Sequence, residues 1–107
     1  MKLLTILIPT CNEDKYILET LKSVKSQTNK DFICIISDNN SSDQTGKVCE
    51  EFVKDDPRFQ YIKQDKNIGS SRNTEFLTQQ VKTEYSMIFA GHDVLEPSFV
   101  EKTLQVI

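Results

Sequence analysis

The sequence predicts an α/β fold: a doubly wound, mostly parallel sheet with helices on both faces. Short apolar runs alternate with amphipathic segments along the chain, and each run ends in a turn of polar or small residues. Neighbouring parallel strands need right-handed crossover connections, and a helix between successive strands supplies them. We therefore expect the strand order 3-2-1-4, with the first strand central and a weakly apolar third strand at an edge.

The N-terminal segment predicts the first strand and the first helix. Residues Leu3–Ile8 form a nearly continuous apolar run, which is typical of a parallel strand covered on both faces. Asn12 is expected to cap the following helix, with Glu13 and Asp14 close to its positive end. The helix then presents one apolar face, made of Ile17, Leu21 and Val24.

The next segment repeats this pattern. Phe32–Ile36 is a short buried run rich in β-branched residues, and the polar turn Asp38–Asp43 separates it from a second helix. Residues Phe59–Ile62 form a weaker run, which predicts the third strand. The inward side of the second helix carries Val48, Cys49 and Phe52.

The remaining elements complete the alternation. Asn67–Ser71 is a turn in which a serine is expected to cap a third helix, and Tyr85–Phe89 predicts the fourth strand. A last helix is expected to start near Pro97. The inward residues of these two helices are Phe76, Leu77 and Val81, and then Phe99, Val100 and Leu104.

Composition limits the functions that the chain can have. A length of 107 residues is enough for one domain. The 13 basic residues are scattered and the net charge is −3, which argues against a nucleic-acid partner. The three cysteines have no CxxC spacing, so we expect reduced thiols, two of them in the core, rather than a zinc site or a disulfide framework. The apolar run near the N-terminus is too short to span a membrane.

The predicted strands all end in polar turns, and parallel strands bring those turns to one edge of the sheet. Asn, Asp, Ser and Gly are common in turns for conformational reasons alone. Gathered at one edge, however, they offer amides and carboxylates to a base and a ribose, and helix N-termini to phosphates. The sequence therefore predicts a nucleotide site at this edge.

Five segments, in this order, resemble family 2 of the inverting glycosyltransferases, and together they cover essentially the whole chain. They are Ile8–Glu13, Leu21–Thr28, Ser37–Thr45, Asn67–Asn73 and Tyr85–Pro97. The family usually has Tyr where this chain has Cys11. The combination is specific, although no single motif is.

The resemblance implies the N-terminal, nucleotide-sugar-binding half of a GT-A fold, as a single domain over residues 1–107 that is truncated at its C-terminus. On this interpretation the Asn39 amide offers a donor and an acceptor to a pyrimidine edge. Glu13 accepts from ribose hydroxyls or complements a helix N-terminus, and Arg72 meets phosphate or base or is an exposed surface residue. The implied nucleotide-sugar-binding residues are Pro9, Thr10, Asn12, Glu13, Asp38, Asn39, Asn67, Gly69, Arg72 and Gly91.

The resemblance also implies a divalent cation, Mn²⁺ or Mg²⁺, on the diphosphate of the donor. The family carries an Asp-x-Asp motif after its fourth strand, and those two positions are Ala90 and His92 in this chain. The expected metal ligands are therefore His92 and the acidic Asp93 that follows it, since Mn²⁺ accepts imidazole as well as carboxylate. The alternative is a decayed metal site in which His92 is a polar loop residue.

The activity implied by the resemblance is transfer of a sugar from a nucleotide-diphosphate donor to a hydroxyl of a glycan or lipid-linked acceptor, with inversion. The catalytic base is expected beyond Ile107, and the protein is expected in the cytoplasm, where the missing part would hold it at the inner membrane surface. We also expect self-association through the open edge of the sheet. The alternative is a non-catalytic nucleotide-binding or assembly module. A phosphoacceptor receiver domain fits poorly, because that fold needs an acidic cluster after its first strand.

Overall fold

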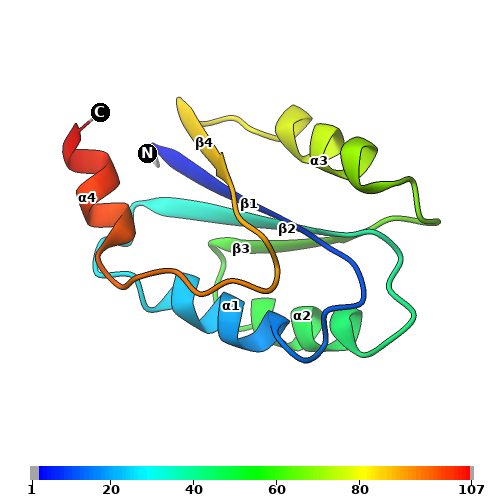
Figure 1. Ribbon diagram of the computed structural model, residues 1–107. Helices are drawn as coiled ribbons and strands as arrows, with labels where there is room; N and C mark the ends of the chain where they lie inside the picture. The colour runs from blue at the N-terminus through cyan, green and yellow to red at the C-terminus, as the bar shows by residue number, and fades with distance from the viewer. Residues whose placement is uncertain (1–2, 107) are drawn as a thin grey trace.

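Four strands form a parallel sheet in the order β3-β2-β1-β4 within residues 3–106, which are the residues described by the computed structural model (Figure 1). The predicted order, the parallel pairing and the central position of the first strand are confirmed. The strands are β1 (Leu4–Thr10), β2 (Phe32–Asp38), β3 (Phe59–Lys63) and β4 (Tyr85–Ile88). The helices are α1 (Ile17–Lys25), α2 (Thr45–Val53), α3 (Ser70–Gln79) and α4 (Phe99–Val106).

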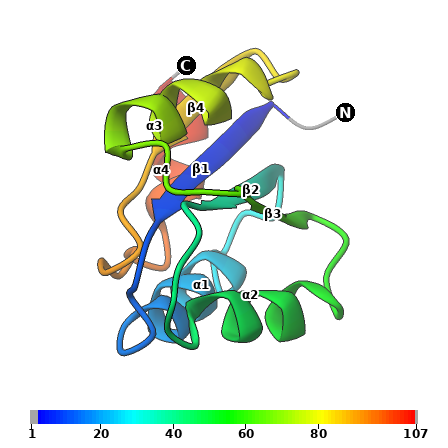
Figure 2. The same cartoon turned by 90° about the vertical axis from the view of Figure 1, so that its right-hand side faces the viewer.

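Helices cover both faces of the sheet, as predicted (Figure 2). Helices α1 and α2 lie on one face and α3 lies on the other. Along β1, Ile6 and Ile8 join the core beneath α1, whereas Leu7 packs with Leu77 of α3. Successive residues of a strand point to opposite faces, so a strand buried on both sides needs the continuous apolar run seen in the sequence.

The register of the strands brings their polar ends to one level. Thr10, the last residue of β1, pairs with Asp38, the last residue of β2, and Asp38 pairs in turn with Lys63 of β3. The loops that follow these three strands therefore start side by side at one edge of the sheet.

Two predicted helix caps are wrong. Helix α1 begins at Ile17 after Tyr16, and Asn12 lies well before it with a φ of 53°. The predicted serine cap of α3 is replaced by Gly69, whose φ of 87° suits glycine. Asn12 instead accepts a hydrogen bond from the Ser42 N–H in the loop after β2. Gly69 donates its own N–H to Asn67 Oδ1, which fixes the turn before α3.

Gln27 connects α1 to the segment that leads into α4. Its side chain is fully buried. Its Nε2 donates to the carbonyl oxygen of Glu96 at 2.7 Å, and its Oε1 accepts from the backbone N–H of Val100 at 2.9 Å. The backbone of Thr28 also donates to the Pro97 carbonyl oxygen at 2.9 Å. The end of the Leu21–Thr28 motif thus fixes the chain that returns from β4.

We expect Gln27→Ala to lower the free energy of unfolding by about 2–4 kcal/mol, because buried backbone groups lose their partners. Urea denaturation would measure this loss. Gln79→Ala, at an exposed position of α3, is the matched control and should change stability by less than about 0.5 kcal/mol. Equal stabilities for the two variants would contradict this role.

Candidate functional site

A cleft of about 240 Å³ opens at the carboxyl edge of the sheet. Its walls come from the end of β1 and the following loop, from the residue after β2, and from the first turns of α3. The lining residues are Pro9, Thr10, Cys11, Glu13, Asn39, Ser70, Asn73 and Thr74. Four of the predicted site residues, Pro9, Thr10, Glu13 and Asn39, are therefore brought together here.

Beside the cleft, Gly91 of the loop after β4 packs directly against Thr10 and Glu13, which are two of the lining residues. A Cβ atom at this position would lie 2.8 Å from Thr10 Oγ1 and 2.7 Å from Glu13 Oε1, so only glycine fits without rearrangement. Thr10 Oγ1 donates a hydrogen bond of 2.8 Å to the same Glu13 oxygen. The loop after β4 is thereby seated against the loop after β1.

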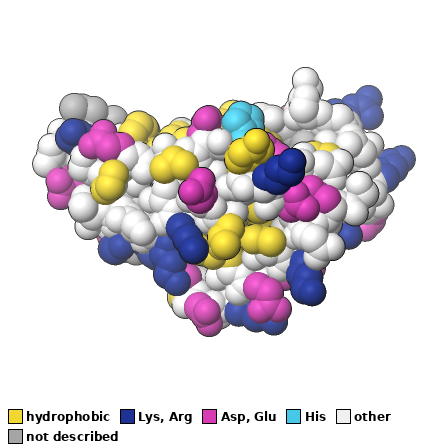
Figure 3. All heavy atoms as spheres, turned by 60° about the horizontal axis from the view of Figure 1, so that its bottom comes forward, with side chains coloured by type: hydrophobic (Ala, Val, Ile, Leu, Met, Phe, Trp, Pro, Cys, Tyr) yellow, Lys and Arg dark blue, Asp and Glu magenta, His cyan; other side chains and the backbone are white. Residues whose placement is uncertain are grey.

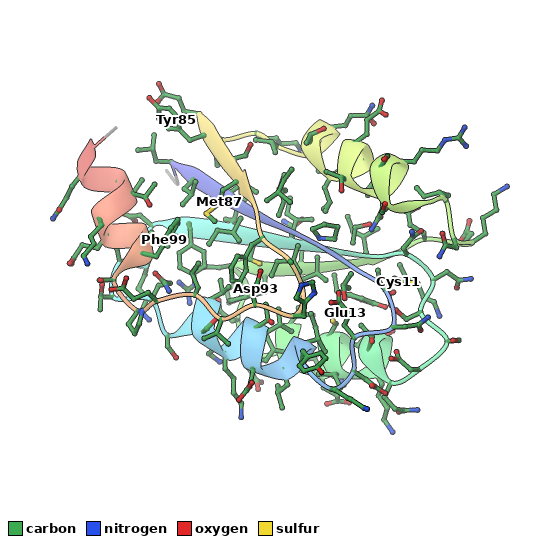
Figure 4. The ribbon with its side chains drawn as sticks, in the orientation of Figure 1. Cys11, Glu13, Tyr85, Met87, Asp93 and Phe99 are labelled. Atoms are coloured by element: carbon green, nitrogen blue, oxygen red, sulfur yellow. The ribbon has the colours of Figure 1, made fainter. Side chains whose placement is uncertain are left out.

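The second oxygen of Glu13 binds His92. The His92 Nδ1–H donates to Glu13 Oε2 at 2.6 Å, and the imidazole is 58% exposed whereas the Glu13 side chain is 18% exposed. The hydrogen bond that His92 donates to Glu13, together with the negative charge of Glu13, raises the pKa of His92 above the ordinary value of 6.5. In Figure 3 the single histidine lies open to solvent, and in Figure 4 Glu13 and Cys11 lie on the loop after β1.

Asp38 is fully buried and organises the loop after β2. Its Oδ1 accepts from the backbone N–H and the hydroxyl of Ser41, at 2.9 and 2.6 Å. Its Oδ2 accepts from the hydroxyl of Tyr61 at 2.6 Å. Burial, followed by the hydrogen bond to Asp38, raises the pKa of Tyr61, so the phenol stays protonated and donates. Asp38 therefore positions the loop, with no surface left for a ligand.

Asn39 holds the turn before α3. Its Oδ1 accepts from the Ile68 N–H at 2.8 Å and its Nδ2 donates to Asn67 Oδ1 at 3.1 Å. Asn67 Oδ1 also accepts from the Gly69 N–H at 2.9 Å. The predicted residues Asn39, Asn67 and Gly69 thus form one hydrogen-bonded unit beside the cleft.

Cys11 lies between the two asparagines. Its thiol donates to the Asn39 carbonyl oxygen at 3.5 Å, and Asn67 Nδ2 approaches the sulfur at 3.7 Å. Burial and then the charge of Asp38 raise the pKa of the Cys11 thiol. The thiol is therefore a neutral lining group. The two cysteines predicted in the core, Cys34 and Cys49, are both buried.

Asn12 connects the loops that follow β1 and β2. Its Oδ1 accepts from the Ser42 N–H at 2.8 Å, and its own N–H donates to Ser41 Oγ at 2.8 Å. The neighbouring Glu13 N–H donates to Thr45 Oγ1 at 2.8 Å. Asn12 is exposed and outside the lining of the cleft, so it positions the loops.

The helix α3 contributes a polar stripe that the sequence analysis did not identify. Ser70, Asn73 and Thr74 follow the helical spacing i, i+3, i+4, and Leu77 continues the same face into the core. Asn73 is 1% exposed and clamps the helix to β2, since its Nδ2 donates to the Ser37 carbonyl oxygen at 3.0 Å. The predicted residue Arg72 lies elsewhere on α3, beside Glu75, Phe76 and Gln79 and outside the cleft.

The two residues expected to hold a cation, His92 and Asp93, are tied to other parts of the fold, and their role as metal ligands stays a prediction. His92 Nδ1 is engaged by Glu13, and the Asp93 backbone carbonyl accepts from Thr20 Oγ1 at 2.6 Å, which ties this loop to α1. Residues 3–106 contain no group of three or more His, Cys, Asp or Glu side chains placed to hold a metal ion. None of the helices in the described part of the chain is long and apolar enough for a membrane span.

The parallel strand order 3-2-1-4 with alternating helices is that of the N-terminal part of a GT-A fold. The chain matches Glycosyl transferase family 2 over residues 5–107 and belongs to that family.

Curated relatives carry the same segment within longer chains. The teichoic acid poly(glycerol phosphate) polymerase of Staphylococcus epidermidis is 34% identical over 96 residues, which are 89% of this chain and 13% of that protein. The chondroitin synthase of Escherichia coli is 35% identical over 103 residues, which are 95% of this chain and 15% of that protein. This chain thus spans a small part of the relatives that it matches.

Solved structures show the same arrangement of strands and helices. S. aureus TarS in complex with UDP-GlcNAc superimposes with a TM-score of 0.88 at 22% identity, covering 98% of this chain and 30% of that one. A mannosyltransferase of Pyrobaculum calidifontis, in complex with GDP-Man and Mn²⁺, gives a TM-score of 0.77 at 18% identity, covering 85% of this chain and 28% of that one. These similarities establish the fold.

We expect the imidazole of His92 to titrate with a midpoint above 6.5, measured by NMR on this single histidine. Because the pKa is raised in the folded state, the contact with Glu13 contributes stability at pH below the unfolded value, and this contribution disappears as the pH rises through the folded value. Glu13→Gln removes the charge and should bring the midpoint back toward about 6.5. Glu101→Gln, at an exposed position of α4, is the control. An unchanged midpoint in Glu13→Gln would contradict the pairing.

Proposed function

We propose that this chain binds the nucleoside diphosphate of an activated sugar in the cleft at the carboxyl edge of the sheet. The observation that carries the proposal is the joining of the segments that follow the four strands: Asn39 holds the turn before α3, and Gly91 seats the loop after β4 on Thr10. Ligands of doubly wound folds bind at this edge. The UDP-GlcNAc complex of TarS, which has this fold, supports the choice of ligand class.

The cleft offers groups suited to the base and ribose of such a ligand. The amide of Asn39, in the lining, and that of Asn67, beside the cleft, carry donors and acceptors of the kind that read a base edge. The hydroxyl of Ser70, at the N-terminal end of α3 beside these asparagines, adds a further donor and acceptor. We infer that base and ribose lie toward the asparagines. The diphosphate then lies toward Gly91.

In the parent protein we infer transfer of the sugar to an acceptor hydroxyl with inversion, in a cytoplasmic enzyme acting on a glycan or lipid-linked acceptor. The general base is assigned to residues beyond Ile107. The part played by this chain is to hold the donor and to orient its leaving diphosphate. Membership of the family and the biosynthetic relatives support this inference.

A second candidate function is a non-catalytic binding module. The observation that favours it is Ala90, whose methyl side chain offers no polar group to a donor at a position where the family carries Asp. Donor turnover by the full-length protein would distinguish an enzyme from such a module.

We expect the 107-residue chain to bind UDP or GDP in isothermal titration calorimetry and to transfer no sugar, since we assign the catalytic base to residues beyond Ile107. The corresponding free nucleoside should bind more weakly, because it lacks the diphosphate. An absence of binding heat for both nucleotides at millimolar concentration would refute the proposed site.

Asn39→Ala should weaken nucleotide binding by about 1–2 kcal/mol, because a polar group of the base site loses its partner and the turn at Ile68 is released. Calorimetry would measure the affinity, and a thermal melt of the same sample would show that the variant is folded. Gln79→Ala, outside the cleft, should bind as the wild type does. Identical affinities for Asn39→Ala and wild type would remove Asn39 from the site.

A further inference from the structure

The cleft needs positive charge to accept a diphosphate, and its lining supplies none. The lining residues include no lysine or arginine, and Glu13 adds a negative charge. Within residues 3–106, the basic side chain that forms an ion pair with a lining residue is His92, at 2.6 Å from Glu13. Any diphosphate near Gly91 therefore meets the Glu13 carboxylate together with the imidazole that donates to it.

The His92 ring is held in one orientation. Glu13 Oε2 accepts from Nδ1, and Glu13 itself is fixed by Thr10 through its other oxygen, at 2.8 Å. Gly91 packs against both of these side chains, so the backbone next to His92 is fixed as well. The structure gives Nε2 no partner among residues 3–106, and the ring is 58% exposed. The free nitrogen is therefore available to a ligand.

The same arrangement suits a divalent cation poorly. Mn²⁺ accepts an imidazole, but Mg²⁺ and Mn²⁺ both prefer carboxylate and carbonyl oxygens. Ala90 offers no oxygen from its side chain, and the carboxylate of Glu13 is already bound by Thr10 and His92. The two positions at which the family carries Asp thus present an alanine and one fixed imidazole, and the residue that follows them, Asp93, adds an exposed carboxylate.

We propose that this chain binds the diphosphate of its donor without a divalent cation, and that the His92 imidazole, held by Glu13, takes the place of the cation. A ring with protons on both nitrogens donates one to Glu13 and the other to a phosphate oxygen. This inference rests on the proposed function, because it concerns the diphosphate end of the same site.

The test measures the affinity for UDP and GDP by calorimetry, once in EDTA and once with Mn²⁺. For the wild type we expect equal affinities in the two conditions, for whichever nucleotide binds. Binding that requires Mn²⁺, or that Mn²⁺ strengthens more than about tenfold, would overturn the inference and leave the proposed function standing. No binding in any condition would remove both. The tenfold limit corresponds to one strong polar interaction.

Three variants of one loop sharpen the test. His92→Ala should weaken binding in EDTA about tenfold, the loss of one charge-assisted hydrogen bond. His92→Asp should bind weakly in EDTA and recover with Mn²⁺, because it restores a carboxylate. Val94→Ala, at a position 65% exposed on the same loop, is the matched control and should behave as the wild type. Wild-type affinity for His92→Ala in EDTA would overturn the inference.

A second measurement reports on the metal directly. His92 is the single histidine of the chain, so its ring signals in an NMR spectrum are identified without ambiguity. Mn²⁺ is paramagnetic and broadens signals of nuclei close to it. We expect the ring signals of the UDP-saturated protein to keep their widths when Mn²⁺ is added in stoichiometric amount. Selective broadening of these signals would place the cation at His92 and contradict the inference.

Discussion

The buried carboxylate of Asp38 is the group on which the geometry of the site depends. It ends β2, and its two oxygens are bound by Ser41 and by the Tyr61 hydroxyl. Gly46 makes room for this cluster, since a Cβ there would lie 2.8 Å from the Tyr61 oxygen and 3.1 Å from Asp38. A buried charge is tolerated only where such partners surround it. The loop after β2 therefore has one conformation that satisfies the carboxylate.

That conformation then fixes the loop after β1. Ser41 accepts from the N–H of Asn12, and Thr45 accepts from the N–H of Glu13. The position of Glu13 in turn sets the position of His92, through the contact at 2.6 Å. A chain of short hydrogen bonds thus runs from the buried end of β2 to the exposed ring after β4. Each link fixes the next because the backbone groups involved have no competing partner in a helix or a strand.

The fold could be predicted from the sequence because apolar periodicity reports burial directly. The run at Phe32–Ile36 and the helical spacing of Ile17, Leu21 and Val24 each indicate an element buried where the structure buries it. The caps could not be predicted in the same way. Asn12 has the local chemistry of a helix cap, but its oxygen is used by Ser42, which is thirty residues away in the sequence. A tertiary contact of that kind leaves no local pattern.

The same distinction holds for the residues of the site: some could be predicted from the sequence, and others depend on the three-dimensional arrangement. Turns at strand ends lie at one edge of any parallel sheet, so Thr10, Glu13 and Asn39 could be predicted from topology. The residues of α3 that line the cleft could be identified only once the rotation of this helix about its axis was known. Because Leu77 faces the core, Ser70, Asn73 and Thr74 share its side of the helix, whereas Arg72 is about 200° around the axis from Ser70 and points away. Arg72, which was chosen for its charge, therefore lies exposed and outside the cleft, in keeping with the alternative of a surface residue.

The short length of β4 also determines the geometry of the site. β4 pairs with β1 only from Leu4 to Leu7, although β1 continues to Thr10. Beyond this pairing, the Phe89 N–H still donates to the Leu7 carbonyl oxygen at 2.8 Å, and the chain then leaves the sheet. A longer β4 would continue the ladder beside Pro9, which has no N–H to contribute. By leaving the ladder there, the chain instead brings Gly91 onto Thr10 and His92 onto Glu13. Because the pairing with β4 stops at Leu7, the end of β1 is contacted by the loop after β4 instead of by a longer strand.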